Sequence, residues 1–330
     1  MSRIIVVSNL QKHFRVFKHR RGMGGAFRNL FSRQYKVVRA VDGVSFQIRP
    51  GELVGYLGPN GAGKSTTLKM LTGLLVPSGG ELWVNDRVPW RERQAHVATI
   101  GAVFGQRTTL WWDLPVIESL DLLQYIYKIP PHRFRRNMAE FRKMLELDPF
   151  LDTPVRSLSL GQRMRADLCA ALLHDPILLF LDEPTIGLDV VAKERIRQFI
   201  RHVNRERGTT VILTTHDLSD VEKLCERVMI IDQGRLLFDG ALDTLRERFG
   251  GKRALVVDFA QEYDDVTVAD AQVIERDGRR AVYQFEQEVL TASELIGRLS
   301  ARYRIRDLSV REPDIEATVR RIYEERLLEG

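Results

Sequence analysis

Gly58-Pro59-Asn60-Gly61-Ala62-Gly63-Lys64-Ser65 is the stretch of this 330-residue chain that decides its fold. It fits the pattern G-x-x-x-x-G-K-[ST], in which a glycine-rich loop joins a strand to a helix. An apolar run of buried-strand type, 53–57, precedes the loop, and a predicted helix, about 65–74, follows it. An ordinary glycine-rich turn before a helix is the competing interpretation, but the strand, the Lys-Ser pair and the helix all favour a phosphate loop.

The chemistry of phosphate binding explains this spacing. Glycines allow successive backbone N–H groups to point inward at a phosphate, and the helix N-terminus adds a favourable dipole. Lys64 is expected to bridge phosphate oxygens, and the Ser65 hydroxyl is expected to ligate Mg²⁺. Kinases, GTPases and motor proteins share such a loop, so on its own it predicts only a nucleoside triphosphate. The residues expected to bind it are Gly58, Pro59, Asn60, Gly61, Ala62, Gly63, Lys64, Ser65 and Thr66.

A second apolar run, 177–181, ends in two carboxylates, Asp182 and Glu183. Parallel strands end on one edge of a sheet, so both carboxylates are expected beside the phosphate loop. There Asp182 is suited to hold Mg²⁺ near Ser65, while Glu183 faces the γ-phosphate and polarises the attacking water. The pattern is weak in isolation. Its position downstream of a phosphate loop and a helical insert is what gives it meaning.

Between these two sites lies Leu158-Ser159-Leu160-Gly161-Gln162, at the start of a predicted helix. The pentapeptide resembles the signature motif of ATP-binding cassette (ABC) proteins, usually Leu-Ser-Gly-Gly-Gln, and departs from it at Leu160. The resemblance implies that Ser159 and Gly161, with Gln162 beside them, contact the γ-phosphate bound by an opposite subunit. A plain helix start capped by serine is the competing interpretation.

Further elements resemble those of the ABC family, in the order in which the family has them. Gln106, after a predicted strand, resembles the glutamine that touches Mg²⁺ and the attacking water and senses the transmembrane partner. The loop 186–189, with Asp189, resembles the loop that communicates across the dimer, and His216 resembles the switch histidine on the γ-phosphate. The resemblance thus implies an ATPase that uses ATP and Mg²⁺. Its catalytic residues would be Glu183, His216 and Gln106, and its metal-binding residues Ser65, Gln106 and Asp182.

One aromatic side chain is expected to stack on adenine. Tyr35, just ahead of a core strand, resembles the family's residue for that role. Phe14 and Phe17 are rivals, because residues 11–34 look like a basic, glycine-containing insertion that makes the correspondence ambiguous. The sequence leaves the choice among the three open.

Alternating strands and helices around these motifs predict an α/β protein. The resemblance specifies a P-loop NTPase of ABC type: a mostly parallel core sheet, an antiparallel β subdomain, and a helical subdomain at about 110–175 that contains the signature motif. Residues 1–250 are assigned to this nucleotide-binding domain. Beyond two glycines the pattern changes, and 251–330 is assigned to a small α+β domain whose last helix opens at Pro313.

The net charge of +6 is unevenly distributed, since the first 41 residues contain ten Lys or Arg and no Asp or Glu. The rest of the chain is slightly acidic, so no nucleic-acid partner is expected. The basic segment 11–34 suits a membrane surface with anionic lipids, an acidic partner or a solvated loop equally well. No stretch without charges is long enough to span a bilayer. Cys169 and Cys225, far apart and in helix-like contexts, are expected to be buried thiols.

Within the family, the segment 105–115, the single cassette and the tail 311–316 resemble the ATPases of ABC-2-type exporters. The resemblance implies a peripheral protein on the cytoplasmic side of the inner membrane that binds transmembrane permease subunits. Because all hydrolytic elements are present, a homodimer is favoured over a dimer with another cassette. Trp111 and Trp112 fit either a docking site for the permease or the buried core of the helical insert. A soluble ABC ATPase acting on ribosomes or nucleic acid is the alternative function.

Overall fold

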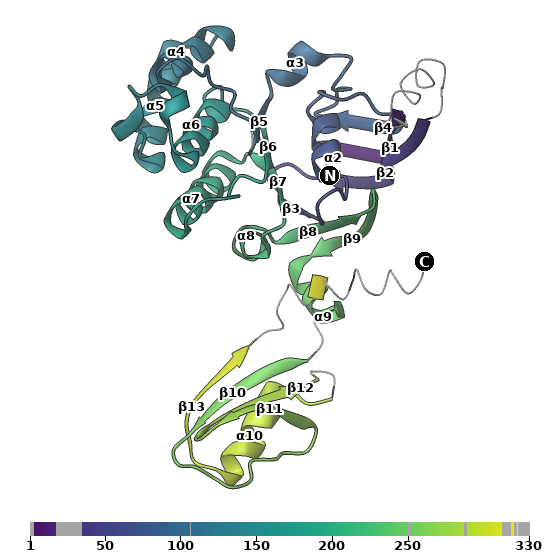
Figure 1. The fold of residues 1–330 in the computed structure, drawn as a ribbon, viewed down its shortest axis with the longest axis vertical. Helices are drawn as coiled ribbons and strands as arrows, with labels where there is room; N and C mark the ends of the chain where they lie inside the picture. The colour runs from purple at the N-terminus through teal and green to yellow at the C-terminus, as the bar shows by residue number, and fades with distance from the viewer. Residues whose placement is uncertain are drawn as a thin grey trace, which may run out of the picture. The chain divides into compact units, whose positions relative to one another are not determined.

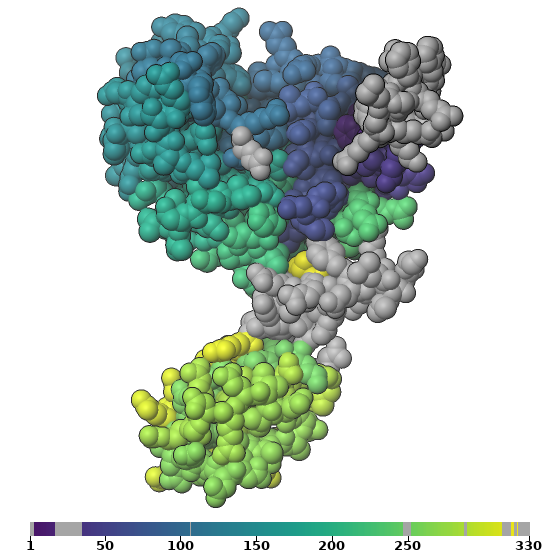
Figure 2. Space-filling model, in the orientation of Figure 1, coloured from purple at the N-terminus to yellow at the C-terminus, as the bar shows by residue number. Residues whose placement is uncertain are grey.

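The structure, a computed structural model, falls into two compact units, Met1–Gly240 and Ala241–Gly330. Figure 1 draws them as a ribbon and Figure 2 as a space-filling surface. Each unit has its own hydrophobic core, so each is described by itself. Within the part of the chain that the structure describes, no helix has the length and hydropathy needed to cross a bilayer. The described residues are 3–17, 35–105, 107–249, 252–286, 289–311, 318, 319 and 322.

The larger unit is built on a six-stranded sheet in the order β5-β6-β7-β3-β8-β9. The strands from β5 to β8 in this order run parallel to their neighbours. Their sequences are nearly continuous apolar or β-branched runs, as expected where both faces of a parallel sheet are covered. The α/β class predicted from the sequence is therefore confirmed. The strands are β3 (Leu53–Leu57), β5 (Ile100–Phe104), β6 (Leu178–Asp182), β7 (Thr210–Thr215), β8 (Arg227–Asp232) and β9 (Arg235–Ala241).

Helices follow or connect the strands β3, β6, β7 and β8. Helix α2 (Lys64–Leu71) follows β3, α7 (Val190–Arg207) leads from β6 to β7, and α8 (Leu218–Leu224) leads from β7 to β8. Asp189 and Asp217 cap α7 and α8, because each carboxylate accepts a hydrogen bond from a backbone N–H of the first turn. The two caps fix where α7 begins after β6 and where α8 begins after β7.

A three-stranded antiparallel sheet in the order β2-β1-β4 belongs to the same unit and is the antiparallel subdomain that the sequence predicted. Its strands are β1 (Ile5–Phe17), β2 (Tyr35–Ile48) and β4 (Gly79–Val84), and the short helix α3 (Arg93–Val97) follows β4. Buried residues of this sheet share one hydrophobic cluster with residues of β3 and β6. The two sheets are therefore packed into a single core.

The prediction that an insertion begins at residue 11 was wrong. The β1–β2 ladder continues past Leu10 to the pair Phe17–Tyr35, so 11–17 belong to a strand. Irregularities in the register near Leu10 and Lys12 disturb the alternation of side chains, and the strand signal is lost there. Residues 18–34, the rest of the predicted insertion, lie outside the described part of the chain.

The helical part of this unit lies between β5 and β6, as expected for residues of about 110–175. Phe141 packs edge to face on Phe199 of α7 with ring centroids 5.4 Å apart, which ties the helical part to the core. Cys169 and Cys225 are buried and free, as predicted. The elements are α4 (Val116–Ile126), α5 (Pro131–Leu145), the 3₁₀ turns η1 (Asp148–Phe150) and η2 (Val155–Ser157), and α6 (Leu160–Leu172).

The smaller unit is an α+β domain in which one helix covers a four-stranded antiparallel sheet of order β11-β12-β10-β13. Leu295 and Leu299 of the helix pack on the central strands. The sequence did not predict β11, whose residues are mostly polar and exposed. The residues at which the last helix was predicted to open, 312–317, lie outside the described part. The elements are α9 (Leu242–Phe249), β10 (Arg253–Phe259), β11 (Ala271–Asp277), β12 (Arg280–Phe285), α10 (Ala292–Arg302) and β13 (Ile305–Arg311).

Candidate functional site

The glycine-rich loop joins β3 to α2 and is held tightly against neighbouring backbone. Gly61 and Gly63 adopt positive φ angles of 85° and 111°. A Cβ on Gly63 would lie 2.4 Å from the carbonyl oxygen of Ala40, and a Cβ on Gly58 would lie 2.4 Å from that of Ile231. These positions therefore require glycine, and the loop is fixed in a shape that presents its N–H groups.

Lys64 points back into the loop. Its Nζ donates hydrogen bonds to the carbonyl oxygens of Gly58 (2.6 Å) and Pro59 (3.2 Å) and lies 3.9 Å from Oε1 of Glu183. Burial lowers the pKa of Lys64, while the charges of Glu183 and Asp182 act in the opposite direction. The cation is only 5% exposed, and its partners are oxygens that phosphate oxygens can replace.

Asp182, at the end of β6, joins the phosphate loop to the next strand. Its Oδ1 accepts hydrogen bonds from Oγ of Ser65 (3.1 Å) and from Oγ1 of Thr214 (2.6 Å). Carboxylate and hydroxyl oxygens are the ligands that Mg²⁺ prefers, so this pair fits the predicted metal site. Over the described residues there is no cluster of three or more His, Cys, Asp or Glu side chains that could hold a metal.

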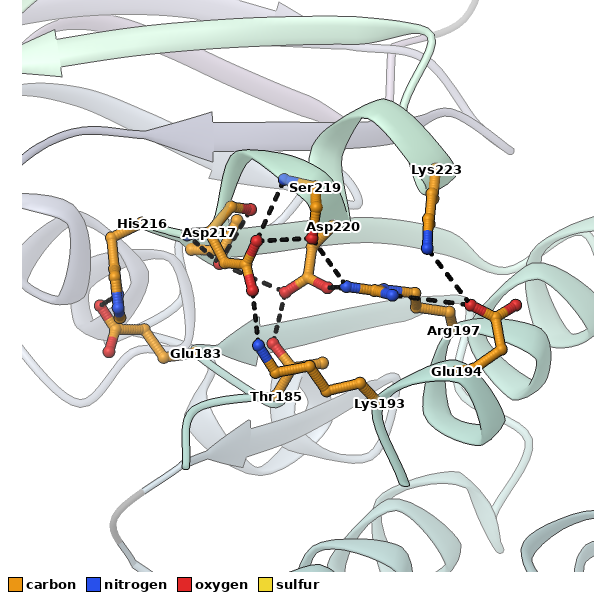
Figure 3. A network of polar contacts seen from close by, with 11 residues as sticks. Glu183, Thr185, Lys193, Glu194, Arg197, His216, Asp217, Ser219, Asp220 and Lys223 are labelled. Atoms are coloured by element: carbon orange, nitrogen blue, oxygen red, sulfur yellow. Dashed lines mark hydrogen bonds and ion pairs between the residues drawn. The ribbon is translucent and has the colours of Figure 1, made fainter. Parts of the chain in front are cut away.

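Glu183 and His216 face each other across the ends of β6 and β7, as Figure 3 shows. Nδ1 of His216 lies 3.2 Å from Oε1 of Glu183. The φ angle of Glu183 is 54°, in the left-handed region that side-chain-bearing residues rarely adopt. Such a conformation persists only where the surroundings enforce it, and one restraint is the hydrogen bond from N of Glu183 to O of Thr214 (2.9 Å).

Ser65, Asp182 and Glu183 line one cleft of about 440 Å³. A larger hollow of about 1040 Å³ runs along β1 and β2, and there Arg227 is paired with Glu52 (2.7 Å) and Asp239 (2.8 Å). We therefore identify the smaller cleft as the candidate site because of its side chains and not because of its volume. Gln106 lies outside the described residues, so the structure does not place it. The cleft residues are Asn60, Ser65, Lys69, Leu74, Phe104, Gly105, Arg107, Asp182 and Glu183.

The segment 158–162 begins α6 with a reciprocal cap. Oγ of Ser159 accepts a hydrogen bond from N of Gln162 (3.2 Å), and Oε1 of Gln162 accepts one from N of Ser159 (2.8 Å). Leu160, the departure from the usual motif, packs on the loop 186–189, 3.1 Å from where a Cβ of Gly187 would lie. Of the described residues that line the cleft, none comes from this segment.

The candidate adenine-stacking residues differ in their distance from the phosphate loop. Ala40 of β2 contacts the loop at Gly63. Phe14 pairs with Val38, about 7 Å along the strand from Ala40, whereas Tyr35 is about 16 Å away at 3.3 Å per residue. Lys12 lies over the Phe14 ring (5.3 Å). The register therefore places Phe14 nearer to the phosphates than Tyr35.

Several polar residues that lie behind the cleft were not predicted from the sequence. Figure 3 shows Thr185, Arg197, Asp217 and Asp220 in a network that adjoins Glu183 and His216. Although partial burial acts the other way, hydrogen bonds from Lys193 and Ser219 hold the pKa of Asp217 at about 2. The sequence gives only a weak indication of this network, because its hydroxyl and carboxyl residues include some that lie within a few positions of Glu183 and His216. The members of the network are Thr185, Lys193, Glu194, Arg197, Thr215, Asp217, Ser219, Asp220 and Lys223.

The fold and this cleft define a P-loop ATPase of the ATP-binding cassette class. A family model described as "ABC transporter" matches residues 41–186. The chain is 34% identical to the ABC transporter ATP-binding protein NatA of Bacillus subtilis (strain 168), over 66% of this chain and 88% of that protein. The chain therefore belongs to the ATP-binding proteins of ABC transporters.

Two other relatives match nearly the full chain. The Nod factor export ATP-binding protein I of Burkholderia orbicola (strain AU 1054) is 35% identical over 89% of this chain and 96% of its own length. The linearmycin resistance ATP-binding protein LnrL of Bacillus subtilis (strain 168) is 32% identical over 84% and 91%. Both matches extend well beyond the family model's residues.

Solved structures show the same fold. One titled as an ATP binding subunit of an ABC transporter superposes with a TM-score of 0.63 at 25% identity, covering 75% of this chain and 93% of that one. The ATP-binding cassette MJ0796, solved as a dimer in a post-hydrolysis state bound to ADP and Pi, gives 0.59 at 28% identity, covering 72% and 98%.

Proposed function

We propose that Glu183 is the residue that orients and activates water for ATP hydrolysis, with His216 beside it on the γ-phosphate. The observation that carries this assignment is the juxtaposition of Glu183 Oε1 with His216 Nδ1 at 3.2 Å and with Lys64 Nζ at 3.9 Å. A carboxylate in that place accepts a proton from water while the two cationic or polar groups bind the phosphate. Ser65 and Asp182 would hold Mg²⁺, which neutralises phosphate charge when bound.

The test is Glu183→Gln, which keeps the shape of the side chain and removes its basicity. Turnover is expected to fall by about 100-fold or more, as for the loss of a general base, while ATP binding persists. Steady-state ATPase rates and nucleotide titration on the same preparation measure the two separately. Turnover close to that of the native protein would contradict the assignment.

The protein works as a homodimer in this proposal. The cleft contains the phosphate loop, Asp182 and Glu183, while 158–162 lies on the helical part and does not line it. A helix N-terminus suits a γ-phosphate, so Ser159 and Gly161 of one copy would complete the site of the other. The dimeric MJ0796 cassette supports this arrangement.

The dimer powers an exporter through ABC-2-type permease subunits, on the cytoplasmic side of the inner membrane. The names of two relatives, in Nod factor export and linearmycin resistance, support export. Trp111 and Trp112 are 39% and 50% exposed, so they do not form a buried core and are available to dock a permease. Transport relatives over nearly the whole chain do not favour the alternative of a soluble ATPase on ribosomes or nucleic acid. Residues 251–330 would serve as a dimerisation or regulatory domain.

A further inference from the structure

A buried ion pair lies behind the cleft, away from the residues that meet ATP. Asp220 is 0% exposed and Arg197 is 3% exposed. Oδ1 of Asp220 accepts a hydrogen bond from Nε of Arg197 at 2.6 Å. Taking two charges out of water is costly, and apolar residues of similar volume are often as stable. The pair therefore calls for a reason other than stability.

The other oxygen of Asp220 connects to both predicted hydrolytic residues. Oδ2 accepts a short hydrogen bond from Oγ1 of Thr185 and a longer one from Oγ1 of Thr215 at 3.4 Å. Thr185 stands two positions after Glu183, and Thr215 stands directly before His216. One carboxylate thus restrains the chain on both sides of the pair that faces ATP.

A second restraint acts on the other side of His216. N of Asp217 donates to Oγ1 of Thr215 (2.9 Å), and Oδ2 of Asp217 accepts from Nζ of Lys193 at 2.6 Å. Lys193 and Arg197 are four positions apart on α7 and so share one helix face (Figure 3). His216 is therefore held between two residues that are both anchored to α7.

We propose that Asp220 and Thr185 are positioning residues for hydrolysis: they hold Glu183 and His216 at the separation the reaction needs. This inference rests on the proposed roles of those two residues. The left-handed backbone of Glu183 is strained and needs restraints on either side. The bond to Thr214 supplies one restraint, and the Thr185–Asp220 bond supplies the other.

The sharpest test uses Thr185, because it can be changed with the Arg197–Asp220 pair left in place. Thr185→Val has the same shape and lacks the hydroxyl, while Thr185→Ser keeps it. Lys223→Gln is the matched control at the exposed rim of the network, where Lys223 pairs with Glu194 at 3.8 Å. All are made in the full chain, with Glu183→Gln alongside, and are assayed for kcat, KM, ATP affinity and melting temperature.

Thr185→Val is expected to lower kcat by roughly 10- to 100-fold, the effect of misplacing a catalytic group by about 1 Å, with ATP affinity within about twofold of native. Thr185→Ser is expected to restore most of kcat, and Lys223→Gln to match the native protein. A purely structural role would instead lower the melting temperature and leave kcat of the folded fraction intact.

The possible outcomes separate this inference from the function on which it rests. If Glu183→Gln abolishes turnover and Thr185→Val does not lower kcat, this inference alone is overturned. If Glu183→Gln turns over normally, both fall. If Thr185→Val does not fold, Thr215→Val against Thr215→Ser asks the same question on the His216 side, with the same loss and rescue of kcat expected. Equal kcat for those two variants would overturn the inference.

Discussion

Phe14 and Tyr35 lie near the ends of paired strands, and both rings are partly exposed. The register places Phe14 about 10 Å nearer to the phosphate loop than Tyr35, at about 3.3 Å per residue. Stacking of a base on an aromatic ring contributes about 1–3 kcal/mol. We therefore expect Phe14→Ala to weaken ATP binding by roughly 10-fold, and Tyr35→Ala to change it little, measured by nucleotide titration.

The two variants serve as each other's control, because both remove an exposed ring that a cation covers: Lys12 for Phe14 and Arg15 for Tyr35. GTP and ATP should be affected alike, since stacking does not read the base edge. A larger loss for Tyr35→Ala would return the adenine contact to the residue that the family resemblance suggested first.

Single residues of the site differed in how far the sequence could place them. Asp182 and His216 were predictable because Asp182 ends one strand and His216 directly follows another, and the ends of parallel strands meet at one edge. Lys64 was predictable from the glycine-rich loop between β3 and α2. Thr185 and Asp220 were not, since a buried polar residue is recognised only through the partner that folding brings to it. They are 35 positions apart, and the intervening sequence carries no pattern that predicts the bond.

Helix α6 carries a buried carboxylate that should make its packing depend on pH. Oδ1 of Asp167 accepts hydrogen bonds from Oγ1 of Thr108 (2.8 Å) and N of Thr109 (2.9 Å). Burial raises the pKa of Asp167 to about 6, although these bonds and Arg163 act in the opposite direction. A raised pKa means that folding favours the protonated form of Asp167. The stability that this group contributes to the fold is therefore complete below the unfolded pKa of 3.8 and is lost as pH rises through 6.

Asp167→Asn should remove this pH dependence, because its amide oxygen keeps the acceptor and carries no charge. The difference in unfolding free energy, variant minus native, is expected to rise in favour of the variant by up to about 3 kcal/mol between pH 4 and 7. Denaturant titrations at several pH values measure it. Parallel curves for the two proteins would show that Asp167 has an ordinary pKa.

The turn before α4 presents the two tryptophans assigned to permease docking. Trp112 lies over the guanidinium of Arg163 at 5.6 Å, which keeps its ring at the surface of the helical part. Replacing Trp111 and Trp112 with Ala should release the permease in a pull-down and leave ATP binding intact. Trp83→Ala removes an equally exposed tryptophan from β4 and should leave the complex bound. Equal recovery of permease with all variants would contradict docking at this turn.

Elements were predictable where their side-chain pattern was strong. The parallel strands and α7 matched to within a few residues because apolar runs and caps mark them. The far half of β1 was lost because register irregularities and Lys and Arg side chains interrupt its alternation. Strand β11 was lost because an exposed edge strand has only one buried neighbour to select its residues.

At the scale of the whole molecule, the order of the motifs along the chain predicted the class of protein. We propose from the folded structure that one copy of the chain supplies only part of the ATP site. Among the described residues that line the cleft are Asn60 and Ser65 of the phosphate loop, Asp182 and Glu183, and none comes from 158–162. The segment 158–162, which resembles the signature motif, lies at the start of α6 and not in the cleft. The sequence alone could not predict this separation. A second copy related by twofold symmetry would supply that segment to each cleft.

Mixing two inactive variants tests whether the site is shared between copies. Lys64→Ala removes the phosphate-loop cation. Gly161→Asp places a carboxylate where the γ-phosphate of the other copy is expected, and it should fold, since a Cβ there meets only Ala192 and Leu188 at 3.7 and 3.8 Å. An acidic residue in the first helical turn is also favourable. Each variant alone is expected to be inactive in an ATPase assay.

A mixed dimer of these variants contains one cleft with both changes and one cleft with neither. Random pairing therefore restores about a quarter of all sites, so mixing should recover up to roughly a quarter of the native rate per chain. The recovered rate should grow with total protein concentration, because association limits it. Mixing Lys64→Ala with Lys64→Ala,Gly161→Asp is the control and restores no complete site. An inactive mixture of the two single variants would mean that each chain contains a complete site of its own, or that hydrolysis requires both sites of the dimer to be intact.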